Sequence, residues 1–240
     1  MAEARSPKNL AEAMQGASAH GATDVEVVVM PAPATTDPRL VVAEAPQSQA
    51  AGSFRALRQR VVDSPERRTF LVTSTGPGEG KSVTAANLAL ALSELGRARV
   101  VLVDAHPAAP MVATLFKVPE PPTWTVTLQA RRGADVAPPW EVVRQGDADV
   151  HLLTACREPA VPAPLASDYA HLLALLRRAF DFVVVDGPAL SARPDAAVLA
   201  ENVDGVIVVA SAGRTRARAL RQALEQIPAH RLLGTVVLER

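Results

Sequence analysis

One stretch of this sequence reads Thr75-Gly76-Pro77-Gly78-Glu79-Gly80-Lys81-Ser82 and lies between an apolar run at residues 70–74 and a helical pattern at residues 83–95. A strand, a glycine-rich turn and a helix in this order form a phosphate-binding loop. The glycines let successive backbone N–H groups point toward a polyphosphate, and the helix adds the positive end of its dipole. Lys81 places a positive charge at the outer phosphates, and the Ser82 hydroxyl is suited to hold Mg²⁺. The stretch therefore predicts nucleotide binding.

The loop is a variant of the general pattern G-x-x-x-x-G-K-[ST], which requires glycine where this chain has Thr75. The alternative interpretation is a glycine-rich turn without a ligand. Gly80, Lys81 and Ser82 stand at the strand-to-helix junction that phosphate binding requires, and this position favours a nucleotide site. The predicted nucleotide contacts are Gly76, Gly78, Glu79, Gly80, Lys81, Ser82 and Val83.

The charge and composition of the chain exclude several kinds of partner. Its 25 basic residues balance its 25 acidic residues, so nothing in the net charge predicts binding to nucleic acid or attraction to anionic lipid. The single cysteine, Cys156, excludes an internal disulfide framework and fits a reducing cytoplasm. No apolar stretch approaches the ~20 residues that span a bilayer, so we expect membrane association only through a partner.

The composition changes near residue 50. Residues 1–50 are rich in Ala, Pro, Ser and Thr, and we expect them to be mostly disordered, whereas residues 51–240 form one nucleotide-binding domain. Two short apolar runs, at residues 25–29 and 40–42, either form strands or dock against the domain. A helical pattern follows at residues 53–61, and we expect this helix to cover one edge of the sheet. We interpret its arginine-rich face as solvated.

Near-continuous runs of Val and Leu predict strands that are buried on both faces, as in a parallel sheet. The predicted strands are residues 69–74, 99–103, 150–153, 182–185, 205–210 and 233–238. Helical patterns separate them at residues 81–95, 167–179, 194–201 and 214–227, with Ser167 as an N-cap. This alternation predicts a doubly wound α/β fold. Prolines interrupt residues 118–148, which we expect to be mostly loop.

Two acidic residues follow predicted strands. Asp104 ends the strand at residues 99–103, and Asp186 ends the strand at residues 182–185. A single aspartate at a strand end is commonly a turn former or a helix cap. Parallel strands, however, end at the same edge of the sheet, where ligands bind. Because Mg²⁺ is typically held by one or two carboxylates together with phosphates, Asp104, Asp186 and Ser82 form a candidate metal site.

These motifs, in this order and spacing, resemble the bacterial tyrosine kinases, which are the cytoplasmic polysaccharide co-polymerase kinases of capsule and exopolysaccharide synthesis. The resemblance runs from about residue 40 to residue 240. It rests on residues 73–82, Asn87-Leu88-Ala89, Val103-Asp104-Ala105-His106 with Pro110, residues 182–188, Asp195-Ala196 and the upstream helix at residues 54–58.

The resemblance implies a P-loop NTPase fold of the deviant Walker (SIMIBI) type that binds ATP with Mg²⁺. It also implies a partner, the cytoplasmic segment of a transmembrane, Wzz-like chain-length regulator, and hence a cytoplasmic protein peripheral to the inner membrane. By resemblance, Lys81 and Ser82 take the Walker A roles, Asp104 is the first acid of the second Walker motif, and Asp186 is the Walker B acid. The implied catalytic residues are Lys81, Asp104 and Asp186, and the implied metal ligands are Ser82, Asp104 and Asp186.

The second Walker motif departs from the family pattern of Asp-x-Asp followed by arginines. His106 occupies the position of the second acid, and Ala108 and Ala109 occupy the arginine positions. Imidazole is a poor substitute for a carboxylate beside a hard cation. We interpret His106 as a substituted surface residue rather than a base, and we expect catalysis to be weakened or absent.

Three further departures from the family concern phosphorylation, assembly and recognition of the adenine base. The only tyrosine is Tyr169, which lies far from the C-terminal cluster that family kinases phosphorylate between subunits. The family's oligomer motif keeps Arg55 and Arg58 but has Gly52 in place of its acid, so assembly through this helix is a hypothesis. Relatives often have an Asn near the adenine base of the nucleotide, at the position where this chain has Glu239.

The preferred function is therefore an ATP-binding, kinase-like protein that regulates polysaccharide polymerisation or export. One alternative is an active tyrosine kinase or ATPase that acts on another protein, which the retained Lys81, Ser82, Asp104 and Asp186 favour. Another is a positioning ATPase of the ParA/MinD type. Those proteins carry an extra lysine early in the loop, where this chain has Gly76 and Pro77.

Overall fold

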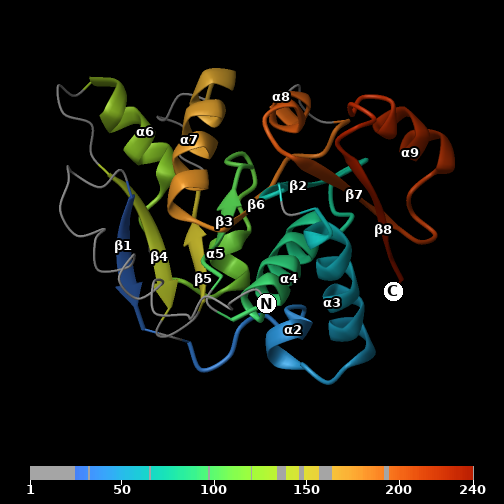
Figure 1. Cartoon of the computed structure of the whole chain (residues 1–240), viewed down its shortest axis with the longest axis horizontal. Coiled ribbons are helices and arrows are strands. Elements are labelled where there is room, and N and C mark those ends of the chain that lie inside the picture. The colour runs from blue at the N-terminus through green and yellow to red at the C-terminus, as the bar shows by residue number, and fades with distance from the viewer. Residues whose placement is uncertain are drawn as a thin grey trace, which may run out of the picture.

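The computed structural model describes residues 25–31, 33–64, 66–96, 98–119, 121–133, 139–145, 149–156, 164–191 and 195–239. Its strands are β1 (Val25–Met30), β2 (Thr69–Ser74), β3 (Val100–Asp104), β4 (Trp140–Gln145), β5 (Val150–Leu153), β6 (Phe182–Asp186), β7 (Gly205–Ser211) and β8 (Leu232–Leu238). They form one sheet in the order β1-β4-β5-β3-β6-β2-β7-β8 (Figure 1). Every neighbouring pair in this sheet is parallel except β4 and β5.

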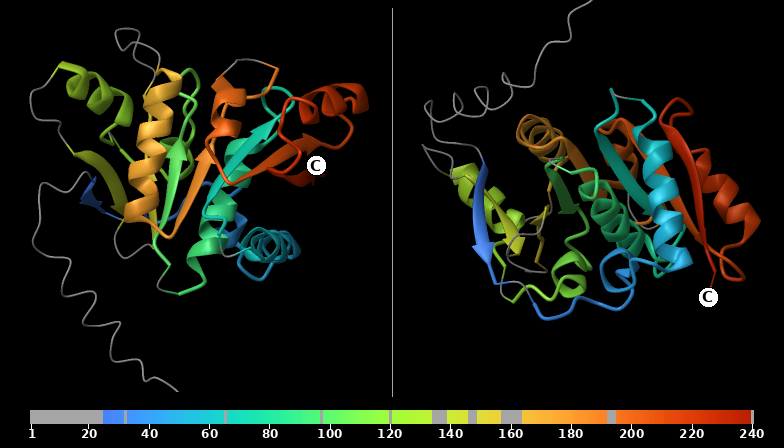
Figure 2. Two further views of the ribbon diagram at one scale, coloured as in Figure 1. Left: turned by 45° about the horizontal axis from the view of Figure 1, so that its top comes forward. Right: turned by 60° about the horizontal axis from the view of Figure 1, so that its bottom comes forward.

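Helices cover both faces of the sheet (Figure 2). They are α2 (Val41–Glu44), α3 (Gln49–Val62), α4 (Lys81–Ser93), α5 (Val112–Leu115), α6 (Trp124–Gly133), α7 (Ala166–Ala179), α8 (Asp195–Glu201) and α9 (Ala217–Leu224). Alternate residues of a strand face opposite layers. Leu71 of β2 packs with residues of α6, α7, α8 and α9, whereas Phe70 and Val72 pack with α4 and α5. The doubly wound, mainly parallel fold is thus confirmed.

The six predicted strands begin and end within one residue of the observed ones. The four helices predicted between the strands are also present, with ends that differ by at most three residues, and the helix predicted at residues 53–61 is present and longer, at Gln49–Val62. Ser167 is not the N-cap of α7. The helix starts one residue before it, and Leu165 is the N-cap, with its backbone N–H donating to the Asp168 carboxylate at 2.6 Å.

The expectation of a loop at residues 118–148 is wrong for much of that segment, which contains α6 and β4. Its prolines stand before these two elements rather than inside them, since Pro121 and Pro122 precede α6 and Pro138 and Pro139 precede β4. The fully buried side chains of Trp124 and Trp140 anchor the two elements in the core.

The described part of residues 1–50 packs against the domain. Residues 25–30 form β1, which pairs with β4, and residues 41–44 form α2, which is a helix rather than a strand. Leu40 is fully buried. The Asn87 side chain of α4 holds this segment, donating to the Arg39 carbonyl at 2.8 Å and accepting from the Val42 N–H at 3.0 Å. Residues 1–24 lie outside the described residues.

The arginine face of α3 is not simply solvated. Arg55 and Arg58 both bind the Glu94 carboxylate just after α4, at 2.6 Å and 3.0 Å, and Arg58 also donates to the Ala91 carbonyl at 2.8 Å. Phe54, one turn before Arg58, packs on Ala91 of α4 beside these contacts. These contacts fix α3 on the layer formed by α4. Within the described ranges, no helix is long and apolar enough to cross a bilayer.

Candidate functional site

The phosphate-binding loop follows β2, which lies between β6 and β7 near the middle of the sheet (Figure 1). Gly78 and Gly80 have φ angles of 71° and 92°, in the left-handed region that favours glycine. A Cβ atom at Gly80 would also lie 2.3 Å from Cδ1 of Leu238, the last residue of β8. Only glycine fits there. The turn brings the chain into α4 at Lys81, as the sequence predicts.

The Glu79 side chain holds the loop in this shape. Its carboxylate accepts the Thr75 hydroxyl at 2.6 Å, the Gly76 N–H at 2.9 Å and the Thr215 hydroxyl at 2.5 Å. Burial raises the pKa of Glu79, but these hydrogen bonds outweigh burial and the pKa lies below its ordinary value. Glu79 is therefore ionised and turned toward its own loop.

The loop after β7 completes this arrangement. The Arg214 guanidinium donates to the Gly78 carbonyl at 3.2 Å and approaches the Pro77 carbonyl at 3.5 Å. Sequence reasoning missed both Arg214 and Thr215. They lie 136 residues from their partners in the loop, and the one available signal was their position just after a strand at the carboxyl edge of the sheet.

The two strand-end aspartates lie side by side, because Asp104 of β3 is in register with Asp186 of β6. Both are essentially fully buried. Burial raises the pKa of Asp104 to about 6, against the opposing effect of backbone hydrogen bonds. Burial, together with the charge of Asp104, raises the pKa of Asp186 to about 7, against the opposing effects of Ser82 and Lys81. The structure thus brings the predicted residues Lys81, Ser82, Asp104 and Asp186 to one place.

Asp104 organises the loop that follows β3. Its Oδ1 accepts the His106 N–H at 3.2 Å, and its Oδ2 accepts the N–H groups of Met111 at 2.8 Å and Val112 at 3.0 Å. Its backbone carbonyl accepts the Trp124 indole N–H at 2.8 Å, which joins α6 to the same point. Most of the acceptor capacity of this carboxylate is thereby used within the chain.

Asp186 has acceptor capacity to spare. The Ser82 hydroxyl lies beside its carboxylate and lowers its pKa, but the buried Oδ1 atom has no hydrogen-bond partner among the described residues. A buried carboxylate oxygen without a partner is costly, so it marks a place for a cation. Ser82 and Asp186 supply the oxygen ligands that Mg²⁺ prefers, and few carboxylates suffice when phosphates complete the shell. The residues therefore fit the implied metal.

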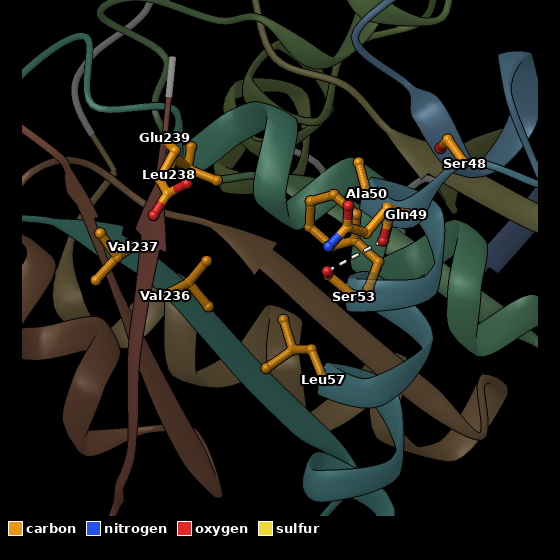
Figure 3. A pocket seen from close by; sticks show the side chains of 10 residues that line it. Ser48, Gln49, Ala50, Ser53, Leu57, Val236, Val237, Leu238 and Glu239 are labelled. Carbon is orange, nitrogen blue, oxygen red and sulfur yellow. Dashed lines mark hydrogen bonds between the residues drawn. The ribbon is translucent and has the colours of Figure 1, made fainter.

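A groove of about 670 Å³ lies between α3 and β8, beside the loop (Figure 3). Leu238 joins the two features, since it lines the groove and also packs over Gly80. The walls combine apolar and hydroxyl side chains, and Glu239 lies at the end of β8. The volume is within the range of small-molecule pockets. The phosphate loop therefore has a concave neighbour of ligand size.

The fold and the phosphate loop define a nucleotide-binding domain, and comparison with known proteins agrees. The family described as CobQ/CobB/MinD/ParA nucleotide binding domain matches residues 70–240. Tyrosine-protein kinase YwqD of Bacillus subtilis is 30% identical over 200 residues, which cover 80% of this chain and 82% of that protein. This chain therefore belongs to the bacterial tyrosine-protein kinase family within that class.

Two further similarities extend this result. Succinoglycan biosynthesis transport protein ExoP of Rhizobium meliloti is 31% identical over 213 residues, which cover 82% of this chain but 26% of that protein. The crystal structure of the chimerical protein CapA2B2 superposes with a TM-score of 0.72 at 26% identity, covering 88% of this chain and 92% of that one.

Proposed function

We propose that this chain is an ATP-binding, kinase-like protein that regulates the polymerisation or export of a polysaccharide, with phosphotransfer weakened or absent. The observation that carries nucleotide binding is the Oδ1 of Asp186, which is buried beside Ser82 and the loop and has no partner among the described residues. The N–H groups of the loop and the Lys81 ammonium would hold the phosphates, while Ser82 and Asp186 would hold Mg²⁺. The metal, when bound, neutralises charge on the phosphates. Asp104 would position the loop that follows β3.

The family supplies the biological setting. YwqD is named a tyrosine-protein kinase and ExoP a succinoglycan biosynthesis transport protein, which supports a role in making an exported polysaccharide. The proposed partner is the cytoplasmic segment of a transmembrane co-polymerase, through which the chain would reach the membrane. In such a complex, nucleotide would act by favouring one docked conformation over another.

The weakened catalysis is proposed from the second Walker motif. His106 stands where the family has an acid, and its backbone N–H donates to the Asp104 carboxylate. Restoring a carboxylate by His106→Asp should raise ATP turnover at least tenfold, since a positioned acid or base contributes ~10²–10⁴-fold. Phosphate release is the measurement. Equal turnover in the wild type and the variant would remove this part of the proposal.

Nucleotide binding is tested by thermal unfolding with and without ATP and Mg²⁺. Ligand at ~100 times its Kd should stabilise the wild type by ~2.7 kcal/mol, and Lys81→Ala should abolish the gain. Lys117→Ala is the matched control, because Lys117 is exposed on the chain after α5. A wild type that gains no stability at any ligand concentration would refute nucleotide binding.

The second candidate is an active kinase that phosphorylates another protein, which the close placement of Asp104 and Asp186 favours. Transfer of labelled phosphate to a partner, lost in Asp186→Asn, would establish it in place of the weakened enzyme. A positioning ATPase is less favoured because Gly76 and Pro77 occupy the region where those proteins carry an additional lysine.

A further inference from the structure

Four exposed arginines lie within eight residues of the chain, two just before α9 and two in the helix itself: Arg214, Arg216, Arg218 and Arg221. The helix lies at the outer end of the sheet, beside β7 and β8 (Figure 1). Arg214 contacts the phosphate loop, so the cluster begins at the carboxyl edge of the strands. We call these four residues the α9 arginine cluster.

The α9 arginine cluster has no acidic partner among the residues that the structure describes. The Arg214 guanidinium donates only to backbone carbonyls, and the side chains of the other three make no hydrogen bond or ion pair within the described ranges. Other arginines do find carboxylates, as in the pairs Arg39–Asp37, Arg55–Glu94 and Arg177–Asp204. The cluster is therefore a local excess of positive charge on a chain whose net charge is zero.

The apolar face of α9 is already used by the fold. Ala223 is buried in the core, and Leu220 and Leu224 pack against it. A helix that lies on a bilayer needs an exposed apolar face to insert, and α9 offers none. Its eight residues span only ~12 Å. Nucleic-acid binding depends on many contacts to phosphates, and four arginines on such a length supply few of them.

We propose that the α9 arginine cluster is the docking surface for a short acidic segment of a partner protein. The guanidinium group is a planar fork of donors that pairs with a carboxylate through two hydrogen bonds. A segment with a few Asp or Glu residues matches the length and charge of the surface. This inference rests on the arginines and their surroundings, and it stands whether or not nucleotide binds.

The test measures binding of a fluorescent oligoglutamate peptide to the full-length, nucleotide-free chain by anisotropy. The peptide should bind, and its affinity should fall as salt screens the charges. The double variant Arg218→Gln/Arg221→Gln should weaken binding about tenfold. The matched control is Arg60→Gln/Arg178→Gln, which removes two exposed arginines on α3 and α7 and should leave binding unchanged.

Three results would overturn the proposal. In the first, oligoglutamate binds no more tightly than oligoglutamine of the same length. In the second, the control variant weakens binding as much as the α9 variant does. In the third, phosphatidylserine vesicles or a DNA duplex bind more tightly than the peptide at the same salt concentration. Circular dichroism of both variants verifies that they are folded.

Discussion

At the scale of single residues, Asp186 destabilises the ligand-free protein at neutral and higher pH. Its carboxyl has a pKa of about 7 in the fold, against 3.8 for an ordinary aspartate. Between these values the native state binds more protons than the unfolded state, so this contribution to stability falls as pH rises through that window. The contribution of Asp104, whose pKa is about 6, to stability also falls as pH rises.

Asp186→Asn should therefore stabilise the ligand-free chain, because it removes a buried negative charge. We expect a gain of roughly 1–3 kcal/mol in the free energy of unfolding at about pH 8. Urea titrations check the value, with the exposed Asp63→Asn as a control that changes little. An Asp186→Asn variant less stable than wild type would contradict the proposed cost of this charge.

Thr215 affects nucleotide binding from outside the phosphate loop. Its hydroxyl donates to Glu79 at 2.5 Å, so Thr215→Val removes one bond from the carboxylate that shapes the loop. A hydrogen bond contributes about 1 kcal/mol, and we expect ATP to bind about fivefold more weakly. Isothermal titration measures this, with Thr235→Val on the exposed side of β8 as the control. Equal ATP affinities of Thr215→Val and wild type would show that the loop holds its shape without this bond.

At the scale of elements, β1 and β4 depend on Trp140. This side chain is 1% exposed, with the Arg131 guanidinium 4.8 Å from its ring centre. Trp140→Ala should cost about 3–5 kcal/mol of unfolding free energy, since large-to-small core changes lose burial and leave a cavity. Val27→Ala on the exposed side of β1 is the control and should cost far less. A small loss in Trp140→Ala would mean that this edge of the sheet is not part of the cooperative core.

The sequence predicted those elements whose local pattern matches their burial. Runs such as residues 100–103 and 183–185 are apolar throughout, because a central parallel strand is covered on both faces. It failed at α6 and β4, where neighbouring prolines outweighed the signal of Trp124 and Trp140. Local pattern does not show whether a proline stands inside an element or just before it.

The candidate site likewise has one part that the sequence predicted and one part that it did not. Asp104 and Asp186 were predicted to meet because the carboxyl ends of parallel strands share one edge of the sheet, and they stand in register. The contact of Thr215 with Glu79 was not predicted. Nothing local to Thr215 distinguishes a threonine that caps a loop from one that faces solvent, and the pairing depends on which strand lies next to β2.

At the scale of the whole molecule, nucleotide binding and folding stability should respond to pH in opposite directions. The ligand-free fold loses stability as Asp104 and Asp186 ionise, whereas a metal ligand must be ionised to bind. The apparent affinity for ATP with Mg²⁺ should therefore rise with pH until Asp186 is fully ionised, by up to about tenfold for each unit below its pKa of about 7.

Thermal shifts with saturating ATP and Mg²⁺, measured at about pH 6 and about pH 8, test this linkage. The stabilisation of the wild type by ligand should be larger at the higher pH, while the ligand-free protein melts at a lower temperature there. A parallel series without Mg²⁺ separates the titration of the nucleotide itself from that of the protein. If the stabilisation is the same at both pH values, Asp186 does not need to lose its proton when the ligand binds, and the proposed Mg²⁺ site at Ser82 and Asp186 is wrong.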